Sequence, residues 1–201
     1  MLDWQIGNIT IRPGMFLLPT ETESATRMVL RRAVEPEETS SGKGAGAAAG
    51  AGAAGCSLLC VIIVDPDAPW GLDQVLHGAA FNCQLGQDAF NPDSGSLVVA
   101  AHRGAGPPAR TGRHRYVAFA FVQPQRFVYS DVAAQLPAFG VDVAGIAAAL
   151  RLGTPVGVNF YTSQFDGSCW LTCMSALICR CFSKPPPDDW FRRAEAKLLT
   201  K

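Results

Sequence analysis

Residues 57–67 read Ser-Leu-Leu-Cys-Val-Ile-Ile-Val-Asp-Pro-Asp, and this stretch decides the fold. Every side chain from Leu58 to Val64 is apolar, and the run ends at Asp65-Pro66. Successive side chains of a strand point to opposite faces, so a strand that is apolar at every position is typical of a sheet covered on both faces. The stretch therefore predicts a buried strand over 57–64 that ends in an Asp-Pro turn.

Outward from this strand, most of the chain shows the spacing of strands. The other expected strands are 9–11, 15–18, 26–34, 75–85, 96–101, 116–123 and 156–165. Helix signals come late. Asp142 is a candidate N-cap for a helix that ends with Gly153 at its C′ position, and helical spacing returns over 168–182 and 188–199. Strands first and helices last predict a mainly β fold, a β-sandwich with peripheral C-terminal helices.

The composition of the chain argues against some classes of function. The chain has 201 residues, with 17 Lys plus Arg and 17 Asp plus Glu, so its formal net charge is zero. A general nucleic-acid binder must neutralise many phosphates and is therefore not expected. No apolar run reaches the roughly 18 to 20 residues of a membrane span. The start of the chain, Met1 to Trp4, has an acid and no basic stretch, which predicts no targeting peptide and a cytoplasmic location.

One segment departs from globular composition. Residues 44–55 consist only of Gly and Ala, and such side chains bury too little area to offset the entropy of ordering. We expect a flexible insert over 36–55 within a single domain that spans 1–184. The sequence Pro185-Pro186-Pro187 opens a C-terminal extension over 185–201, which we expect to form a short helix.

The seven cysteines do not predict a disulfide framework, because the number is odd and no secretory signal is seen. Cys60 and Cys83 lie in apolar runs and are expected to act as small core side chains. The later cysteines are Cys169, Cys173, Cys179 and Cys181. Their spacing contains no Cys-x-x-Cys and favours helix packing over a zinc site.

Three segments place polar groups at the ends of apolar strands, where loops commonly build sites. They are Asp65-Pro66-Asp67, then His77, then the Gly-rich loop that leads from Arg103 to Tyr116. Taken singly, each has a plain structural explanation as a turn or a core histidine. Together they offer backbone N–H, imidazole and phenol groups to phosphate oxygens, while two carboxylates would repel a lone dianion. A ligand with both phosphate and ammonium fits this inventory best.

These motifs resemble the phosphatidylethanolamine-binding protein family, which includes the Raf kinase inhibitor proteins and plant flowering-time regulators. The matching segments, in order over about 8–182, are Asp65-Pro66-Asp67-Ala68-Pro69, His77, Gly106-Pro107-Pro108, Gly112-x-His114-Arg115-Tyr116, and Pro155-Val156 followed by Tyr161. The resemblance implies a sandwich of mainly antiparallel strands with peripheral helices. It also implies a small anion pocket formed by Asp65, Asp67, His77, Gly106, Pro107, His114 and Tyr161.

The chain departs from the family pattern in three places. The loop between Asp67 and His77 is shorter, which removes an aromatic side chain that usually lines the pocket, and Trp70 is the candidate replacement. The Gly/Ala insert is foreign to the family. The tail from Lys184 loosely resembles the extension of a family member built into mitochondrial ribosomes.

We therefore expect a monomeric, non-enzymatic binding module with no cofactor, no metal and no catalytic residue. Its expected ligand is a small molecule or lipid head group that carries phosphate or phosphoethanolamine, and it is expected to regulate a protein partner such as a kinase. One alternative is a scaffold subunit of a mitochondrial assembly such as the ribosome. Another is a hydrolase or zinc enzyme, since two Asp and two His could ligate zinc, but no attacking Ser or Cys is evident near them.

Overall fold

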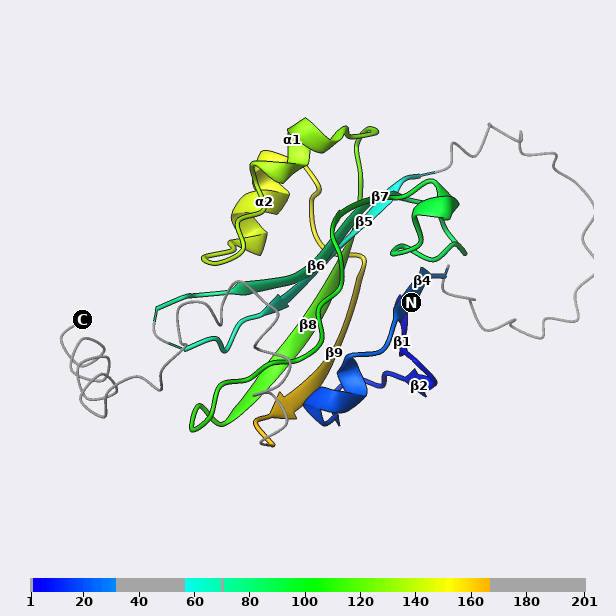
Figure 1. Cartoon of the computed structure of the whole chain (residues 1–201). Coiled ribbons are helices and arrows are strands. Elements are labelled where there is room, and N and C mark those ends of the chain that lie inside the picture. Colours follow the sequence, from blue (N-terminus) through cyan, green and yellow to red (C-terminus); the bar gives the residue numbers. More distant parts are fainter. Residues whose placement is uncertain (1, 32–56, 70, 167–201) are drawn as a thin grey trace, which may run out of the picture.

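The computed structural model describes residues 2–31, 57–69 and 71–166, and it contains two sheets (Figure 1). The three-stranded sheet has the order β2-β1-β4, with β1 (Leu2–Ile6), β2 (Ile9–Thr10) and β4 (Thr26–Leu30). The six-stranded sheet has the order β3-β9-β8-β5-β6-β7, with β3 (Met15–Phe16), β5 (Leu59–Asp65), β6 (Val75–Cys83), β7 (Leu97–Ala100), β8 (Arg113–Val122) and β9 (Gly157–Gln164). All pairings are antiparallel except that of β3 with β9.

The strand β5 lies between β8 and β6, and all seven of its residues are buried. Its odd-numbered residues from Leu59 to Ile63 pack in a core shared with the three-stranded sheet. Its even-numbered residues from Cys60 to Val64 pack in a second core with the helical segments. Figure 1 shows the small sheet on one side of the large sheet and the helices on the other. The prediction of a strand covered on both faces is confirmed.

The helical segments are short: η1 (Pro19–Thr22), η2 (Pro92–Ser94), α1 (Tyr129–Ala133) and α2 (Val143–Ala149). The helix expected after Asp142 is confirmed as α2, and Ile146 is buried against the sheet. Its predicted end at Gly153 is wrong. Leu150 is the C-cap, and Arg151 takes the left-handed conformation with φ of 55°. The helix α1 was not predicted.

Strand β1 and the start of strand β8 also differ from the expectation. The alternation of buried and half-buried residues over Leu2–Ile6 forms β1, which was not predicted. The strand β8 begins at Arg113, three residues before the expected start at Tyr116. As a result His114 and Arg115 lie on a paired strand, opposite residues of β9, and not in the Gly-rich loop.

The mainly β class with few helices is confirmed. Cys60 and Cys83 are buried free thiols, as expected. Burial raises the pKa of Cys60, and it raises the pKa of Cys83 to about 12, so both are uncharged core side chains. No helix in the described ranges is long and apolar enough to cross a membrane. Several predictions concern residues outside the described ranges. They are those for the insert 36–55, Trp70, the four later cysteines, the helices at 168–182 and 188–199, and the extension 185–201.

Candidate functional site

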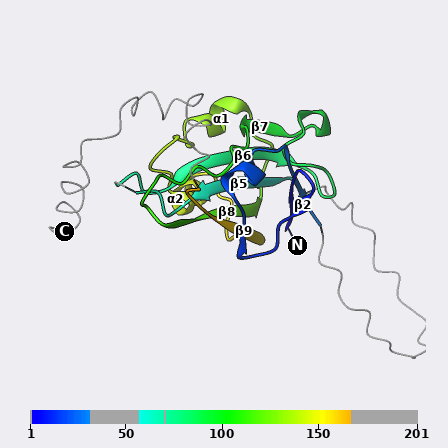
Figure 2. The same cartoon turned by 60° about the horizontal axis from the view of Figure 1, so that its bottom comes forward.

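The strand pairing brings the predicted site segments to one end of the large sheet, where β5 and β9 end and β8 begins. Val64, next to the end of β5, lies opposite Val117 near the start of β8, and Arg113 lies opposite Gln164 at the end of β9. The η1 turn lies at the same end of the sheet, as Figures 1 and 2 both show. Antiparallel pairing thus gathers residues that are far apart in the sequence at what we call the site end of the sheet.

A buried chain of contacts joins three side chains at the site end. His114 Nδ1 lies 2.8 Å from Asp65 Oδ2, and His114 Nε2 lies 2.7 Å from the Thr111 hydroxyl oxygen. That hydroxyl also lies 2.7 Å from the Pro108 carbonyl oxygen, and the Asp67 N–H donates to Asp65 Oδ1. His114 is fully buried and Asp65 almost so.

Hydrogen counting favours one arrangement of the hydrogens in this network. The Thr111 hydroxyl has one hydrogen, and the Pro108 carbonyl can only accept. If the hydroxyl donates to Pro108, His114 Nε2 must carry a hydrogen and donate to Thr111. The contact between His114 and Asp65 holds a second hydrogen. Only this assignment makes all three contacts hydrogen bonds.

The second carboxylate, Asp67, is paired on the outside of the molecule. Arg115 Nε and its terminal nitrogen each donate to Asp67 at 2.7 Å, and the Arg115 backbone N–H adds a bond of 2.9 Å. The hydrogen bonds from Arg115 lower the pKa of Asp67. Both predicted carboxylates therefore already have a partner in the ligand-free protein.

Tyr116 is the centre of an aromatic group beside the buried pair. Its ring stacks on Tyr161 with centroids 5.1 Å apart and meets His77 edge-on at 4.8 Å. Its hydroxyl accepts the N–H of Gly106 at 3.2 Å. A side-chain carbon added at Gly106 would meet no atom within 4 Å, so the molecule is open at this point.

His77 is a neutral hydrogen-bond acceptor. Its Nδ1 lies 3.1 Å from the carbonyl oxygen of Arg103, which can only accept, so Nδ1 carries the hydrogen and Nε2 keeps a free lone pair. Burial lowers the pKa of His77 to about 4, so this form holds at neutral pH. In this form His77 offers an acceptor, and the donor role of an imidazole toward phosphate oxygens stays a prediction.

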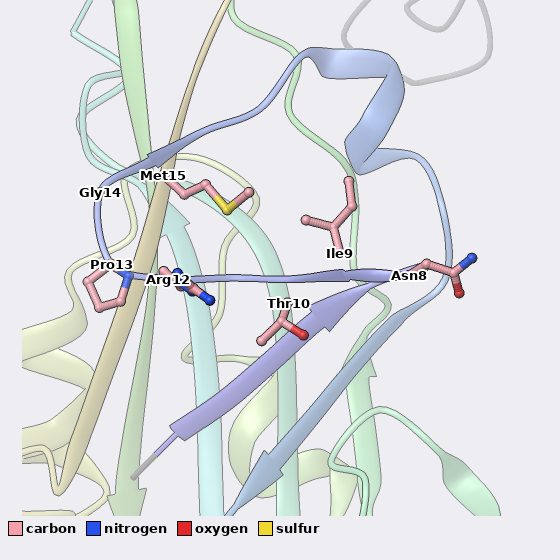
Figure 3. A pocket seen from close by; sticks show the side chains of 7 residues that line it. All are labelled: Asn8, Ile9, Thr10, Arg12, Pro13, Gly14 and Met15. Carbon is pink, nitrogen blue, oxygen red and sulfur yellow. The ribbon is translucent and has the colours of Figure 1, made fainter.

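The structure thus groups His77, Gly106 and Tyr161 around Tyr116, and it pairs Asp65 with His114, which lies two residues before Tyr116 on β8. Asp67 belongs to the same turn but its carboxylate faces Arg115, and Pro107 is buried next to Gly106 in the loop. An open hollow lies elsewhere, lined by the residues from Asn8 to Met15 except Ile11 (Figure 3). None of the predicted site residues lines that hollow. The common ligand cavity stays a prediction.

Sequence reasoning missed several residues that build the site. Tyr116 and Thr111 lie in the Gly-rich segment that was singled out, but their contacts depend on the start of β8. Thr22 was not considered. Its hydroxyl accepts the N–H of Ala105 at 2.7 Å and donates to the Pro19 carbonyl, so η1 holds the loop that carries Gly106. Nothing in the local sequence signals this contact, which spans 83 residues.

Replacing two glycines of this loop with alanine should change the stability of the protein to different extents. A side-chain carbon at Gly104 would lie 2.7 Å from the Thr22 carbonyl oxygen, which is too close, so Gly104→Ala should lower the free energy of unfolding by about 1–3 kcal/mol. Gly106→Ala has open space and should leave stability nearly unchanged. Urea denaturation of both variants tests this. Equal losses would contradict the assigned contact between the loop and η1.

The order Asp65–His114–Thr111 resembles a catalytic relay, but in the favoured arrangement of hydrogens the direction of the His114–Thr111 hydrogen bond is the reverse of the one that a relay needs. The Thr111 hydroxyl donates to Pro108, and His114 donates to Thr111, so the histidine holds no free lone pair to accept the hydroxyl proton. This arrangement does not favour the hydrolase alternative. Within residues 2–31, 57–69 and 71–166, no group of three or more His, Cys, Asp or Glu side chains is placed to hold a metal ion.

Comparison with known proteins identifies a family. A family model described as phosphatidylethanolamine-binding protein matches residues 37–160. A protein named 26 kDa secreted antigen from Toxocara canis is 32% identical over 120 residues, which cover 52% of this chain and 41% of that protein. The chain therefore matches less than half of that relative.

Solved structures show the same fold. A carboxypeptidase Y inhibitor, determined with its cognate proteinase, aligns with a TM-score of 0.58 at 17% identity over 82% of this chain and 83% of its own. The phosphatidylethanolamine-binding protein of Plasmodium vivax aligns with a TM-score of 0.56 at 13% identity over 83% of this chain and 86% of its own. At these identities the likeness extends to the fold alone.

Proposed function

The chain belongs to the phosphatidylethanolamine-binding protein family, and on that premise we propose that it binds phosphorylated or zwitterionic head groups of the phosphoethanolamine type without catalysis. The observation that carries the proposal is the buried Asp65–His114 pair at the site end, with His77 and Tyr116 beside it and open space at Gly106. Polar groups gathered at an open point of a rigid scaffold are typical of a binding site.

The charges at the site end suit a phosphate better than the sequence alone suggested. A bare pair of carboxylates would repel an anion, but the His114 ring lies 2.8 Å from the Asp65 carboxylate and the Arg115 guanidinium pairs with Asp67. The Gly106 N–H lies at the open point and donates to the hydroxyl of the buried Tyr116, and this contact of 3.2 Å is long enough to yield to a stronger acceptor. These groups support contacts with phosphate oxygens.

The site also offers acceptors. His77 Nε2 has a lone pair at neutral pH, and each Asp65 oxygen can accept a further hydrogen bond. An ammonium group supplies the matching donors. This mixture of donors and acceptors favours a ligand that carries both phosphate and amine, as expected from the sequence.

Isothermal titration calorimetry with phosphoethanolamine, inorganic phosphate and ethanolamine tests the proposal. We expect phosphoethanolamine to bind most tightly, phosphate more weakly and ethanolamine not measurably. Tyr116→Phe keeps the ring stack but removes the hydroxyl, and it should weaken phosphoethanolamine binding about 10- to 100-fold, since a hydrogen bond to a charged group contributes about 1.5–3 kcal/mol. Tyr129→Phe on α1 is the matched control, because Tyr129 is exposed. Absence of phosphoethanolamine binding would refute the proposal.

A protein partner such as a kinase is the second part of the proposal, and it rests on the family resemblance. Copurification of the full chain separates this role from the mitochondrial scaffold alternative, because a scaffold subunit would elute with a large assembly. The cytoplasmic location stays a prediction. The Toxocara canis relative is named a secreted antigen, so fractionation of the cells and the medium should accompany that experiment.

A further inference from the structure

Among the described residues, three buried polar side-chain atoms have no hydrogen-bond partner, and two of them lie on β9: the Tyr161 hydroxyl and the Ser163 hydroxyl. We propose that Ser163 is a ligand-contacting residue at the inner end of the head-group site, where its hydroxyl donates to a phosphate oxygen. The inference rests on the proposed function and adds a residue that neither the motifs nor the family resemblance indicated.

The pairing of β8 with β9 places Ser163 within the site. Ser163 lies directly opposite His114, and Tyr161 lies directly opposite Tyr116. Residues directly opposite one another in an antiparallel pair point to the same face with their Cβ atoms about 4.5–5.5 Å apart. Ser163 is thus the neighbour of the buried pair, one residue before the end of β9 at Gln164.

The surrounding groups leave the Ser163 hydroxyl without a partner. Both ring nitrogens of His114 are occupied, one by Asp65 and the other by Thr111. Ser163 is fully buried, so its hydroxyl is shielded from bulk water. A buried hydroxyl without a partner destabilises the ligand-free protein relative to alanine at the same position. A ligand that reaches this hydroxyl recovers that free energy.

The neighbouring group indicates which part of a ligand fits. Tyr161 is fully buried, and burial raises the pKa of its hydroxyl, which therefore stays protonated and can donate. Its hydroxyl lies near that of Thr22 without hydrogen-bond geometry. Tyr161 and Ser163 together present two neutral O–H donors on one face of β9. Two such donors suit the oxygens of a phosphate.

Ser163→Ala in the full chain tests the inference, with phosphoethanolamine as the probe. The variant should be at least as stable as the parent without ligand, and it should bind phosphoethanolamine about tenfold more weakly by calorimetry. Ser96→Ala is the matched control, because its hydroxyl already donates to the Asn91 carbonyl at 3.0 Å and lies on another part of the fold. That variant should keep the parent affinity. If Ser163→Ala does not fold, Ser163→Cys, which keeps a weak donor of similar shape, should show a smaller loss of the same sign.

The outcomes separate this inference from the proposed function. If the parent binds phosphoethanolamine and Ser163→Ala binds it equally well, the hydroxyl holds an ordered water or nothing, and the assignment of Ser163 is overturned while the proposed function stands. If the parent does not bind phosphoethanolamine, the proposed function itself fails. Weaker binding with unchanged or higher stability in the absence of ligand supports Ser163 as a ligand contact.

Discussion

Asp65→Ala should lower the free energy of unfolding by about 3–5 kcal/mol, the range observed when one partner of a buried ion pair is removed. The loss is large because His114 is fully buried and would lose the acceptor of its Nδ1 hydrogen. The Asp67 backbone N–H would also lose its acceptor on Asp65. Urea denaturation at neutral pH, with the slope of the transition compared between variants, measures the effect.

Asp67→Ala is the matched control for that experiment. This variant also removes a carboxylate, two residues further along the chain. Its partner Arg115 has a side chain that is 57% exposed, so water replaces the lost contact. We expect a loss of about 1 kcal/mol or less, as for other exposed ion pairs. If the two variants lose the same free energy, the assignment of Asp65 to a buried network and of Asp67 to a surface pair is contradicted.

Acidification from pH 7 to pH 4 should destabilise the protein strongly through two buried histidines. Burial lowers the pKa of His77 and of His102 to about 4, whereas an unfolded histidine has an ordinary pKa near 6.5. Between these values the unfolded chain binds protons that the folded chain does not. Each histidine therefore removes about 1.4 kcal/mol of stability per pH unit below 6.5, or roughly 3 kcal/mol by pH 4. Below pH 4 both states are protonated and these groups cause no further loss.

His102→Phe isolates half of this effect. The ring of His102 meets Trp4 and Phe90 edge-on, and its Nε2 has no hydrogen-bond partner, so phenylalanine fits the same aromatic surroundings. Unfolding free energies at pH 7.0, 5.5 and 4.5 should fall about half as steeply in the variant as in the parent. A slope equal to that of the parent would show that His102 is not held neutral by burial.

The sequence predicted the fold well where a single physical rule acts on adjacent residues. The unbroken apolar run before Asp65 has one explanation, burial on both faces, and β5 confirms it. Asp142 likewise stands at the N-cap position of α2, as predicted, although its side chain makes no capping hydrogen bond. The end of α2 was missed, because Arg151 adopts a left-handed conformation that the sequence rule reserves for glycine.

The candidate site was predictable as a set of residue types but not as a network. Asp65, His77, His114 and Tyr161 were named from motifs, and the structure pairs Asp65 with His114 and places His77 and Tyr161 against Tyr116. The contact of His114 with Asp65 spans 49 positions and that of His77 with Arg103 spans 26, and no local pattern encodes such contacts. For the same reason the neutralisation of Asp67 by Arg115 and the acceptor role of His77 required the structure.

The central claim, that the site end binds a phosphate-bearing head group, is tested most directly by a two-dimensional ¹H–¹⁵N NMR titration of the full chain with phosphoethanolamine. We predict saturable shifts of the backbone amides of Gly106, Thr111 and Tyr116, which surround the buried Asp65–His114 pair. Shifts confined to the hollow between Asn8 and Met15, or no saturable shifts at all, would contradict the claim.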